Sequence, residues 1–243
     1  MGTSGWQYRD WRSPVYPPGV PQKRWLEYYA ERFATVESNN AFYRLPERDT
    51  FVEWRARTPD DFVMAVKVSR YLTHVRRLRD PGEPVRRFVS RVRGLEEKLG
   101  PVLLQLPPTL QADPGKLEAT LAEFPRTMRV VVEPRHASWW TDPVRDLLTR
   151  YHAALCWADR GSRPITPLWR TAEFGYLRLH HGRARPGYGD AALTSWVRRI
   201  ADTFGTSDVY VYFNNDQQAA APADATRFAH LVSAHGLPVS RAR

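Results

Sequence analysis

Short apolar runs alternate with amphipathic stretches along nearly the whole chain. Eight of these runs have the length and the content of Val, Leu, Ile or aromatic residues that is typical of buried strands. They cover residues 2–6, 35–39, 62–68, 102–106, 129–133, 153–158, 175–180 and 208–213. Several are apolar without interruption, as burial on both faces of a parallel sheet requires, and we therefore predict parallel strands.

Between these runs, hydrophobic residues recur at helical spacing. Helices are predicted at residues 22–33, 48–57, 84–99, 114–124, 142–152, 191–204 and 223–235. The gap between Asp159 and Phe174 is the exception, because Pro164 and Pro167 favour a loop or a broken helix there. The alternation of strand and helix predicts parallel strands that are joined by helical crossovers.

Eight strand-and-helix units in 243 residues match the size of a (β/α)8 TIM-barrel-like fold of the α/β class. A doubly wound open sheet is the alternative. No G-x-G-x-x-G turn opens a helix in this chain, so dinucleotide binding, the commonest function of that second fold, has no support. The sequence contains no internal linker, repeat or low-complexity segment, and we predict one domain over residues 1–243.

Nearly every predicted strand ends on polar side chains, and in a parallel barrel the carboxyl ends of the strands carry the chemistry. The strand-end residues are Trp6, Glu37, Asn39, Lys67, Gln105, Glu133, Arg135, Asp159, Arg178, His180, Asn214 and Asn215. Residues two apart on a strand share a face. The same-facing pairs are Glu37 with Asn39, Glu133 with Arg135, Arg178 with His180, and Tyr212 with Asn214. A single carboxylate beside an arginine is often half of a structural ion pair, but polar ends on so many strands predict a site at the barrel mouth.

The predicted catalytic residues are Glu37, Lys67, Glu133 and His180. In this hypothesis a carboxylate is the general base, His180 or His136 is the acid, and arginines bind an anion in bidentate fashion. For Lys67 a Schiff base and a plain electrostatic contact to an anionic ligand are both open, and the second is the commoner role. The predicted substrate-binding residues are Trp6, Asn39, Tyr43, His74, Gln105, Arg135, His136, Arg178, Asn214 and Asn215. Glu133, Asp159 and His180 are the predicted ligands of a divalent metal ion, the one cofactor that the residues suggest.

The net charge of +10 widens the range of partners. Of the 36 basic residues only four are lysine, and this preference for arginine is typical of a GC-rich genome, so codon usage explains part of the charge. Together with aromatic residues in the first predicted loop, the charge leaves nucleic-acid binding open beside an anionic or sugar-like small molecule.

The single cysteine, Cys156, excludes an internal disulfide and is predicted to be a buried thiol. No signal peptide or membrane span is evident, so we expect a soluble cytoplasmic protein without a membrane partner.

Several sequence motifs occur in a fixed order over nearly the whole chain. They are GTSGWQYRDWRSPVYP, TVESNNAFYRLP, FVMAVKVSRYLTHVRRL, GPVLLQLPP, VVVEPRHASWW, YLRLHHGR and VYVYFNND. With these motifs the chain resembles the YecE-like family, also called domain of unknown function 72. The resemblance implies a TIM-barrel-like fold and points to no particular activity. The chain departs from the family pattern at Ser38, where an aliphatic residue is usual, and at Ala41, where Thr or Ser is usual.

Three hypotheses about function follow from the residues. The first is an enzyme that acts on a phosphorylated or polyhydroxylated substrate, with metal-assisted phosphoester hydrolysis ranked ahead of sugar isomerisation because the mouth is basic. The second is a nucleic-acid-binding or nuclease-like barrel. The third is a barrel that binds a ligand without catalysis. The sequence does not indicate an oligomeric state.

Overall fold

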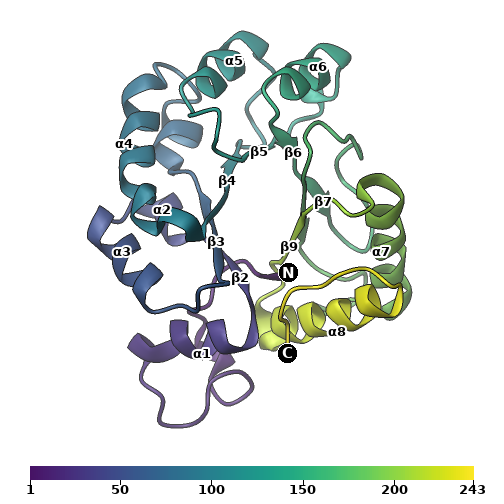
Figure 1. Ribbon diagram of the computed structural model, residues 1–243. Coiled ribbons are helices and arrows are strands. Elements are labelled where there is room, and N and C mark those ends of the chain that lie inside the picture. Colours follow the sequence, from purple (N-terminus) through teal and green to yellow (C-terminus); the bar gives the residue numbers. More distant parts are fainter.

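The computed structural model describes residues 1–243, in which parallel strands form a central ring with helices around it (Figure 1). The strands are β1 (Gly2–Thr3), β2 (Thr35–Ser38), β3 (Val63–Lys67), β4 (Leu99–Gln105), β5 (Val130–Glu133), β6 (Ala154–Leu155), β7 (Trp157–Asp159), β8 (Gly175–Leu179) and β9 (Val209–Phe213). Each of the eight predicted runs contains strand structure, and the sixth run is divided into β6 and β7 by Cys156.

The strands pair in two parallel sheets that meet at both ends. One sheet has the order β2-β3-β4-β5-β6 and the other has the order β1-β9-β8-β7. A parallel bridge between Ser4 and Glu37 connects the end of β1 to β2. At the other end β6 continues into β7 through Cys156, whose N–H donates to the Val132 carbonyl at 2.9 Å. The strand positions therefore follow chain order around the ring, as a TIM-barrel-like fold requires.

The helices α1 to α8 lie outside this ring (Figure 1). They are α1 (Trp25–Arg32), α2 (Asn40–Tyr43), α3 (Arg48–Ala56), α4 (Gly82–Val92), α5 (Pro114–Ala122), α6 (Asp142–Arg150), α7 (Asp190–Phe204) and α8 (Ala220–Ala234). Shorter helical turns are η1 (Arg9–Trp11), η2 (Gln22–Arg24), η3 (Tyr71–Val75), η4 (Arg93–Lys98), η5 (Ala137–Trp139) and η6 (Gln217–Ala219). No helix forms between Asp159 and Phe174, as the two prolines in that segment predict. None of the helices has the length and apolar character needed to cross a bilayer.

The predicted helix at residues 84–99 is divided, in contrast to the expectation. It ends at Val92 and continues as the turn η4, in which Glu96 has a φ of 48°. Gly94 lies where α3 approaches closely, since a Cβ atom there would meet the Arg48 carbonyl oxygen at 2.6 Å. The hydrophobic periodicity does not reveal this break because Leu95 on the turn is buried as well.

Two hydrophobic layers surround the strands, one inside the ring and one outside it. The inner cluster consists of Ala65, Leu103, Val131, Ala154, Cys156, Phe174, Tyr176 and Tyr212. The outer cluster contains 57 buried residues and joins the strands to the helices. Cys156 is fully buried, which confirms the prediction, and burial raises the pKa of its thiol well above the usual value. On the same inner face, two positions after Leu103, Val131 and Tyr176, the strands carry Gln105, Glu133 and Arg178. The inner face therefore becomes polar toward the carboxyl ends of the strands.

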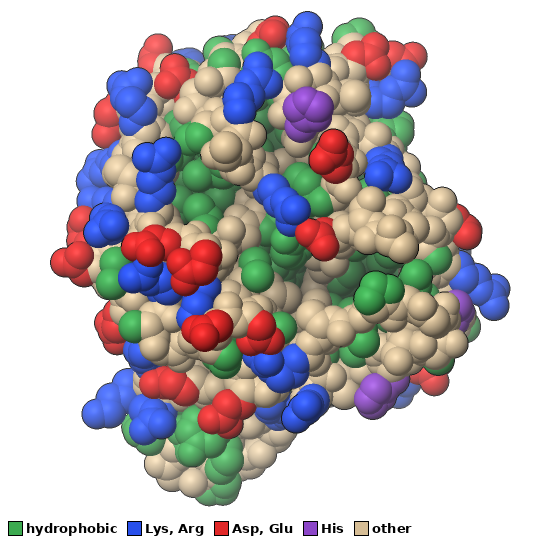
Figure 2. Space-filling view, viewed as in Figure 1, with side chains coloured by type: hydrophobic (Ala, Val, Ile, Leu, Met, Phe, Trp, Pro, Cys, Tyr) green, Lys and Arg blue, Asp and Glu red, His purple; other side chains and the backbone are tan.

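Figure 2 shows one face of the molecule, in the same view as Figure 1. Basic and acidic side chains alternate over this face and no large patch of a single sign is visible (Figure 2). The net charge of +10 is thus not gathered into a continuous basic surface on this side.

Candidate active site

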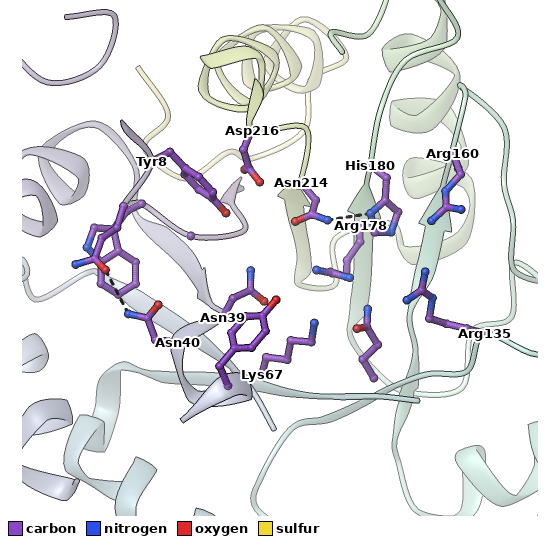
Figure 3. Close-up of a pocket in the computed structure, with 15 residues that line it drawn as sticks. Tyr8, Asn39, Asn40, Lys67, Arg135, Arg160, Arg178, His180, Asn214 and Asp216 are labelled. Carbon is purple, nitrogen blue, oxygen red and sulfur yellow. Dashed lines mark hydrogen bonds between the residues drawn. The ribbon is translucent and has the colours of Figure 1, made fainter. Parts of the chain in front are cut away.

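A cavity of about 540 Å³ opens at the carboxyl ends of the strands (Figure 3). It is lined by Gly5, Trp6, Gln7, Tyr8, Asn39, Asn40, Tyr43, Lys67, Gln105, Arg135, Arg160, Arg178, His180, Asn214 and Asp216. Each strand position of the ring contributes at least one of these residues. Nine of them belong to the predicted site: Trp6, Asn39, Tyr43, Lys67, Gln105, Arg135, Arg178, His180 and Asn214.

Arg178 on β8 forms a buried ion triad with two predicted catalytic carboxylates. Its Nε and Nη2 donate to Oε2 and Oε1 of Glu37 at 3.0 and 2.9 Å, and its Nη1 donates to Oε2 of Glu133 at 2.9 Å. Tyr176 adds a hydrogen bond to Glu37 at 2.6 Å, and Gln105 adds one to Glu133 at 2.9 Å. The bidentate partner of Arg178 is therefore a carboxylate of the protein itself.

Glu37 and Glu133 do not line the cavity, because both are almost completely buried in this triad. Burial by itself raises the pKa of Glu133, but the Arg178 guanidinium, with His180 and Lys67 nearby, holds that pKa below its usual value. Both carboxylates thus lie beneath the cavity and fix the position of Arg178. In this arrangement neither carboxylate can contact a ligand in the cavity directly, as a general base must.

Three cationic side chains at the cavity make no salt bridge: Lys67, Arg135 and Arg160. Lys67 is 8% exposed, and its Nζ lies 4.1 Å from the centroid of the Phe42 ring. Burial, helped by the charge of Arg178, lowers the pKa of Lys67 to about 8. Its ammonium remains mostly protonated at neutral pH and is available to an anion.

Asp216 is the one carboxylate that lines the cavity, and it is not among the residues predicted from the sequence. Its Oδ1 is buried and has no hydrogen-bond partner. Burial raises the pKa of Asp216 to about 7, and the Tyr8 hydroxyl beside it partly opposes that rise. Figure 3 shows Tyr8 and Asp216 side by side at the cavity. A carboxyl group with this pKa can both donate and accept a proton near neutral pH.

His180 and Asn214 form a hydrogen-bonded pair on the same side of the cavity as Asp216 (Figure 3). The distance from Asn214 Nδ2 to His180 Nδ1 is 3.0 Å. An amide nitrogen only donates, so Nδ1 accepts and the ring proton lies on Nε2. Burial, followed by the charge of Arg178, lowers the pKa of His180 to about 4. The imidazole is thus neutral at pH 7 and offers an N–H donor.

The predicted metal ligands are not brought together, and this corrects that part of the prediction. No group of three His, Cys, Asp or Glu residues in the structure is arranged to hold a metal ion. Asp159 shares a strand face with Trp157, which belongs to the outer cluster. Its carboxylate accepts hydrogen bonds from Tyr188 at 2.7 Å and from Trp196 at 2.8 Å. Asp159 therefore points away from Glu133, toward α7.

Three predicted substrate-binding residues also lie outside the cavity. Asn215 points outward, where its Nδ2 donates to Asp224 at 2.8 Å and to the Pro186 carbonyl at 2.9 Å. His136 lies 2.9 Å from the Ser138 hydroxyl and caps the short turn η5. His74 follows β3 and packs edge-on against Phe42. These three side chains stabilise local structure around the mouth.

Six lining residues are not among the predicted site residues, namely Gly5, Gln7, Tyr8, Asn40, Arg160 and Asp216. A signal for Asp216 was present, since Tyr212, Asn214 and Asp216 follow one another at every second position. Arg160 directly follows Asp159, so it has the opposite orientation and faces the cavity instead. The remaining residues lie on loops or on the short helix α2, where strand alternation gives no guidance.

Comparison with known proteins identifies relatives over the whole chain. The family described as "Protein of unknown function DUF72" matches residues 1–242. The UPF0759 protein YecE of Escherichia coli (strain K12) is 34% identical over 118 residues, which cover 47% of this chain and 43% of YecE. The chain thus matches less than half the length of YecE. The UPF0759 protein YunF of Bacillus subtilis (strain 168) is 24% identical, and the match covers 96% of this chain and 94% of YunF.

Two solved structures resemble the chain over almost its entire length. A DUF72 family protein from Thermotoga maritima MSB8 has a TM-score of 0.85 and 25% sequence identity, covering 96% of this chain and 98% of that one. A DUF72 family protein from Enterococcus faecalis V583 has a TM-score of 0.81 and 17% identity, covering 100% of this chain and 97% of that one. The second likeness is one of fold alone.

Proposed function

The chain belongs to the DUF72 family, and we propose that it binds a phosphorylated, sugar-like small molecule in the cavity and performs acid–base chemistry on it. The observation that carries this proposal is the charge of the lining. Four cationic side chains and a single carboxyl group surround about 540 Å³. Such a cavity favours an anionic ligand of small-molecule size.

The cationic side chains differ in their availability to a phosphate group. Lys67, Arg135 and Arg160 have no carboxylate partner and offer charge-assisted hydrogen bonds. Arg178 has five N–H groups, of which three are engaged by Glu37 and Glu133. The two that remain add donors to the floor of the cavity, and the triad holds them in a fixed position.

Neutral polar groups complete the site and suit the hydroxyl groups of a sugar. The amides of Asn39, Gln105 and Asn214 and the N–H of His180 supply both donors and acceptors. Asp216, with a pKa near 7, is the group that transfers the proton. Proton transfer of this kind serves either cleavage of a phosphoester or isomerisation of a sugar.

Binding is tested by titrating the protein with glucose 6-phosphate and with glucose in a calorimeter. We expect saturable binding of the phosphorylated sugar only, and about tenfold weaker binding by Lys67→Met, which removes one charge-assisted contact. Since the pKa of Lys67 is about 8, the affinity of the native protein should fall as the pH rises above 8, and the variant should lose this fall. Arg198→Met, an exposed change on α7, is the control. Equal affinity for both sugars would contradict the proposal.

Turnover is followed by ³¹P NMR with a panel of sugar phosphates. Release of inorganic phosphate indicates phosphoester cleavage, whereas a shifted phosphomonoester signal indicates isomerisation. Either reaction should be abolished by Asp216→Asn while binding persists. If the protein binds panel members but converts none of them, the proposed acid–base chemistry is wrong. The protein would then be a barrel that binds a ligand without catalysis.

A second candidate function is the binding of single-stranded nucleic acid, which one observation favours. The Tyr43 ring at the cavity is 76% exposed and offers a face on which a base can stack, close to the cationic lining. Fluorescence anisotropy with labelled DNA and RNA oligomers at several salt concentrations tests it. Contacts to several phosphates predict a steep decrease in affinity with salt. A flat response would rule this function out.

A further inference from the structure

A second cavity of about 460 Å³ adjoins the proposed site. It shares His180, Asn214 and Asp216 with the first cavity, so these three side chains form a common wall. Figure 3 shows them in a row along one side of the first cavity. The opposite wall of the second cavity is the loop 181–186 that follows β8. A ligand that extends past the common wall reaches this loop.

The loop carries two arginines that form no salt bridge. Arg183 and Arg185 both line the second cavity, are exposed, and make no salt bridge. The carboxylate of Asp216 at the common wall is the one acidic group that lines this cavity. With a pKa of about 7, Asp216 is about half protonated at neutral pH. The second cavity is therefore also positively charged.

The backbone of the loop is held in place, so that its arginines are presented from a fixed frame. The Gly182 N–H donates to the Pro186 carbonyl at 3.2 Å and closes a tight turn. The Asn215 amide donates to the same carbonyl at 2.9 Å, and the His181 N–H donates to the Tyr188 hydroxyl at 3.1 Å. Asn215 and Tyr188 are anchored in turn by Asp224 on α8. A preorganised loop loses less entropy when it binds a ligand.

We infer that the second cavity is a second anion subsite, and that the ligand carries two anionic groups joined by a polar, sugar-like body. One anionic group contacts Lys67, Arg135 and Arg160, and the other contacts Arg183 and Arg185. The polar body lies along the common wall, where the His180 imidazole and the Asn214 amide meet its hydroxyl groups and Asp216 is in reach of its reacting atoms. The chemical class is a sugar bisphosphate. This inference rests on the proposed function.

The test compares glucose 1,6-bisphosphate with glucose 6-phosphate in calorimetric titrations of the full chain. We expect the bisphosphate to bind at least about tenfold more tightly, because a second phosphate gains charge-assisted contacts. The double variant Arg183→Ala/Arg185→Ala should bind the two sugars within about twofold of each other and keep the native affinity for the monophosphate. Arg93→Ala/Arg198→Ala is the matched control, since it removes the same charge at two exposed arginines without salt bridges.

The outcomes separate this inference from the proposed function. If the native protein binds both sugars equally, or if its preference survives in Arg183→Ala/Arg185→Ala, the second subsite is refuted while the proposed function stands. A loss of monophosphate affinity in that variant also refutes the separation into two subsites. If glucose 6-phosphate does not bind to the native protein at all, the proposed function fails, and this inference fails with it.

Discussion

At the scale of single residues, Asp216 differs from the other carboxylates near the mouth because it forms no salt bridge. Glu37 and Glu133 share the charge of Arg178, whereas the Oδ1 of Asp216 is buried without a partner. An unpaired buried carboxyl group favours its neutral form. Its proton is therefore bound more tightly in the folded protein than in the unfolded chain.

Replacement of Asp216 by Asn is expected to change how stability depends on pH. The pKa of this group is about 7 in the folded protein and 3.8 for an ordinary aspartate in water, so the folded state holds an extra proton between these values. The stabilisation is fully present below pH 4 and is lost as the pH rises through 7. Asp216→Asn, which keeps a neutral side chain, should be more stable than the native protein at pH 8 by about 1–2 kcal/mol, after allowance for partial exposure.

Urea denaturation at pH 5 and at pH 8 measures this difference. The gain in unfolding free energy should be larger at pH 8 than at pH 5. Asp202→Asn, an exposed change on α7, should show no such difference. A gain that is the same at both pH values would mean that Asp216 is already ionised at pH 5. It would then be unsuited to the proposed proton transfer near neutral pH.

At the scale of the elements, alternation along the strands explains what the sequence could and could not predict. All eight strand positions and the cavity-lining Lys67, Gln105 and Arg178 follow from apolar runs and their polar ends. Asp159 and Asn215 lie outside the first cavity because each is next to an inward-facing position and therefore points toward the helices, and Asn215 lines the second cavity instead. Loop residues such as Tyr8 depend on tertiary contacts that no local pattern encodes.

The loop 181–186 offers a test of how an element controls ligand selectivity. Its turn leaves no room for a side chain at Gly182, where a Cβ atom would meet the Gly187 carbonyl oxygen at 2.1 Å. Gly182→Ala should therefore displace the loop at a cost of about 1–3 kcal/mol in unfolding free energy. It should also reduce the preference for glucose 1,6-bisphosphate over glucose 6-phosphate.

Gly189→Ala is the matched control in the same connection, since nothing lies within 4 Å of a Cβ atom built there. Gly189 is the N-cap of α7, where Ala is less favourable than Gly, so the variant should lose up to about 1 kcal/mol of unfolding free energy and still keep the bisphosphate preference. Guanidinium denaturation and calorimetry give the two readouts. Unchanged selectivity in Gly182→Ala, despite lower stability, would show that the loop position does not govern the second subsite.

At the scale of the whole molecule, the ion triad connects strands that are distant in sequence. Arg178 on β8 holds Glu37 on β2 and Glu133 on β5 across the interior of the ring. The polar layer of the barrel is therefore a support for the cavity as well as part of its lining. The sequence places these three residues at strand ends but cannot show that they neutralise one another, because their pairing depends on ring closure.

Arg178→Met is expected to destabilise the whole barrel, because it leaves two buried carboxylates without their cation. The loss of unfolding free energy should be about 3–5 kcal/mol at pH 7, measured by urea denaturation. Arg198→Met on the surface should change it by less than about 0.5 kcal/mol. If the cost arises from uncompensated charge, Glu37→Gln/Glu133→Gln/Arg178→Met should recover most of the stability, since all three charges are then absent. A triple variant as unstable as Arg178→Met would instead assign the cost to lost packing and hydrogen bonds, and the support of the cavity would then rest on the shape of the arginine rather than on its charge.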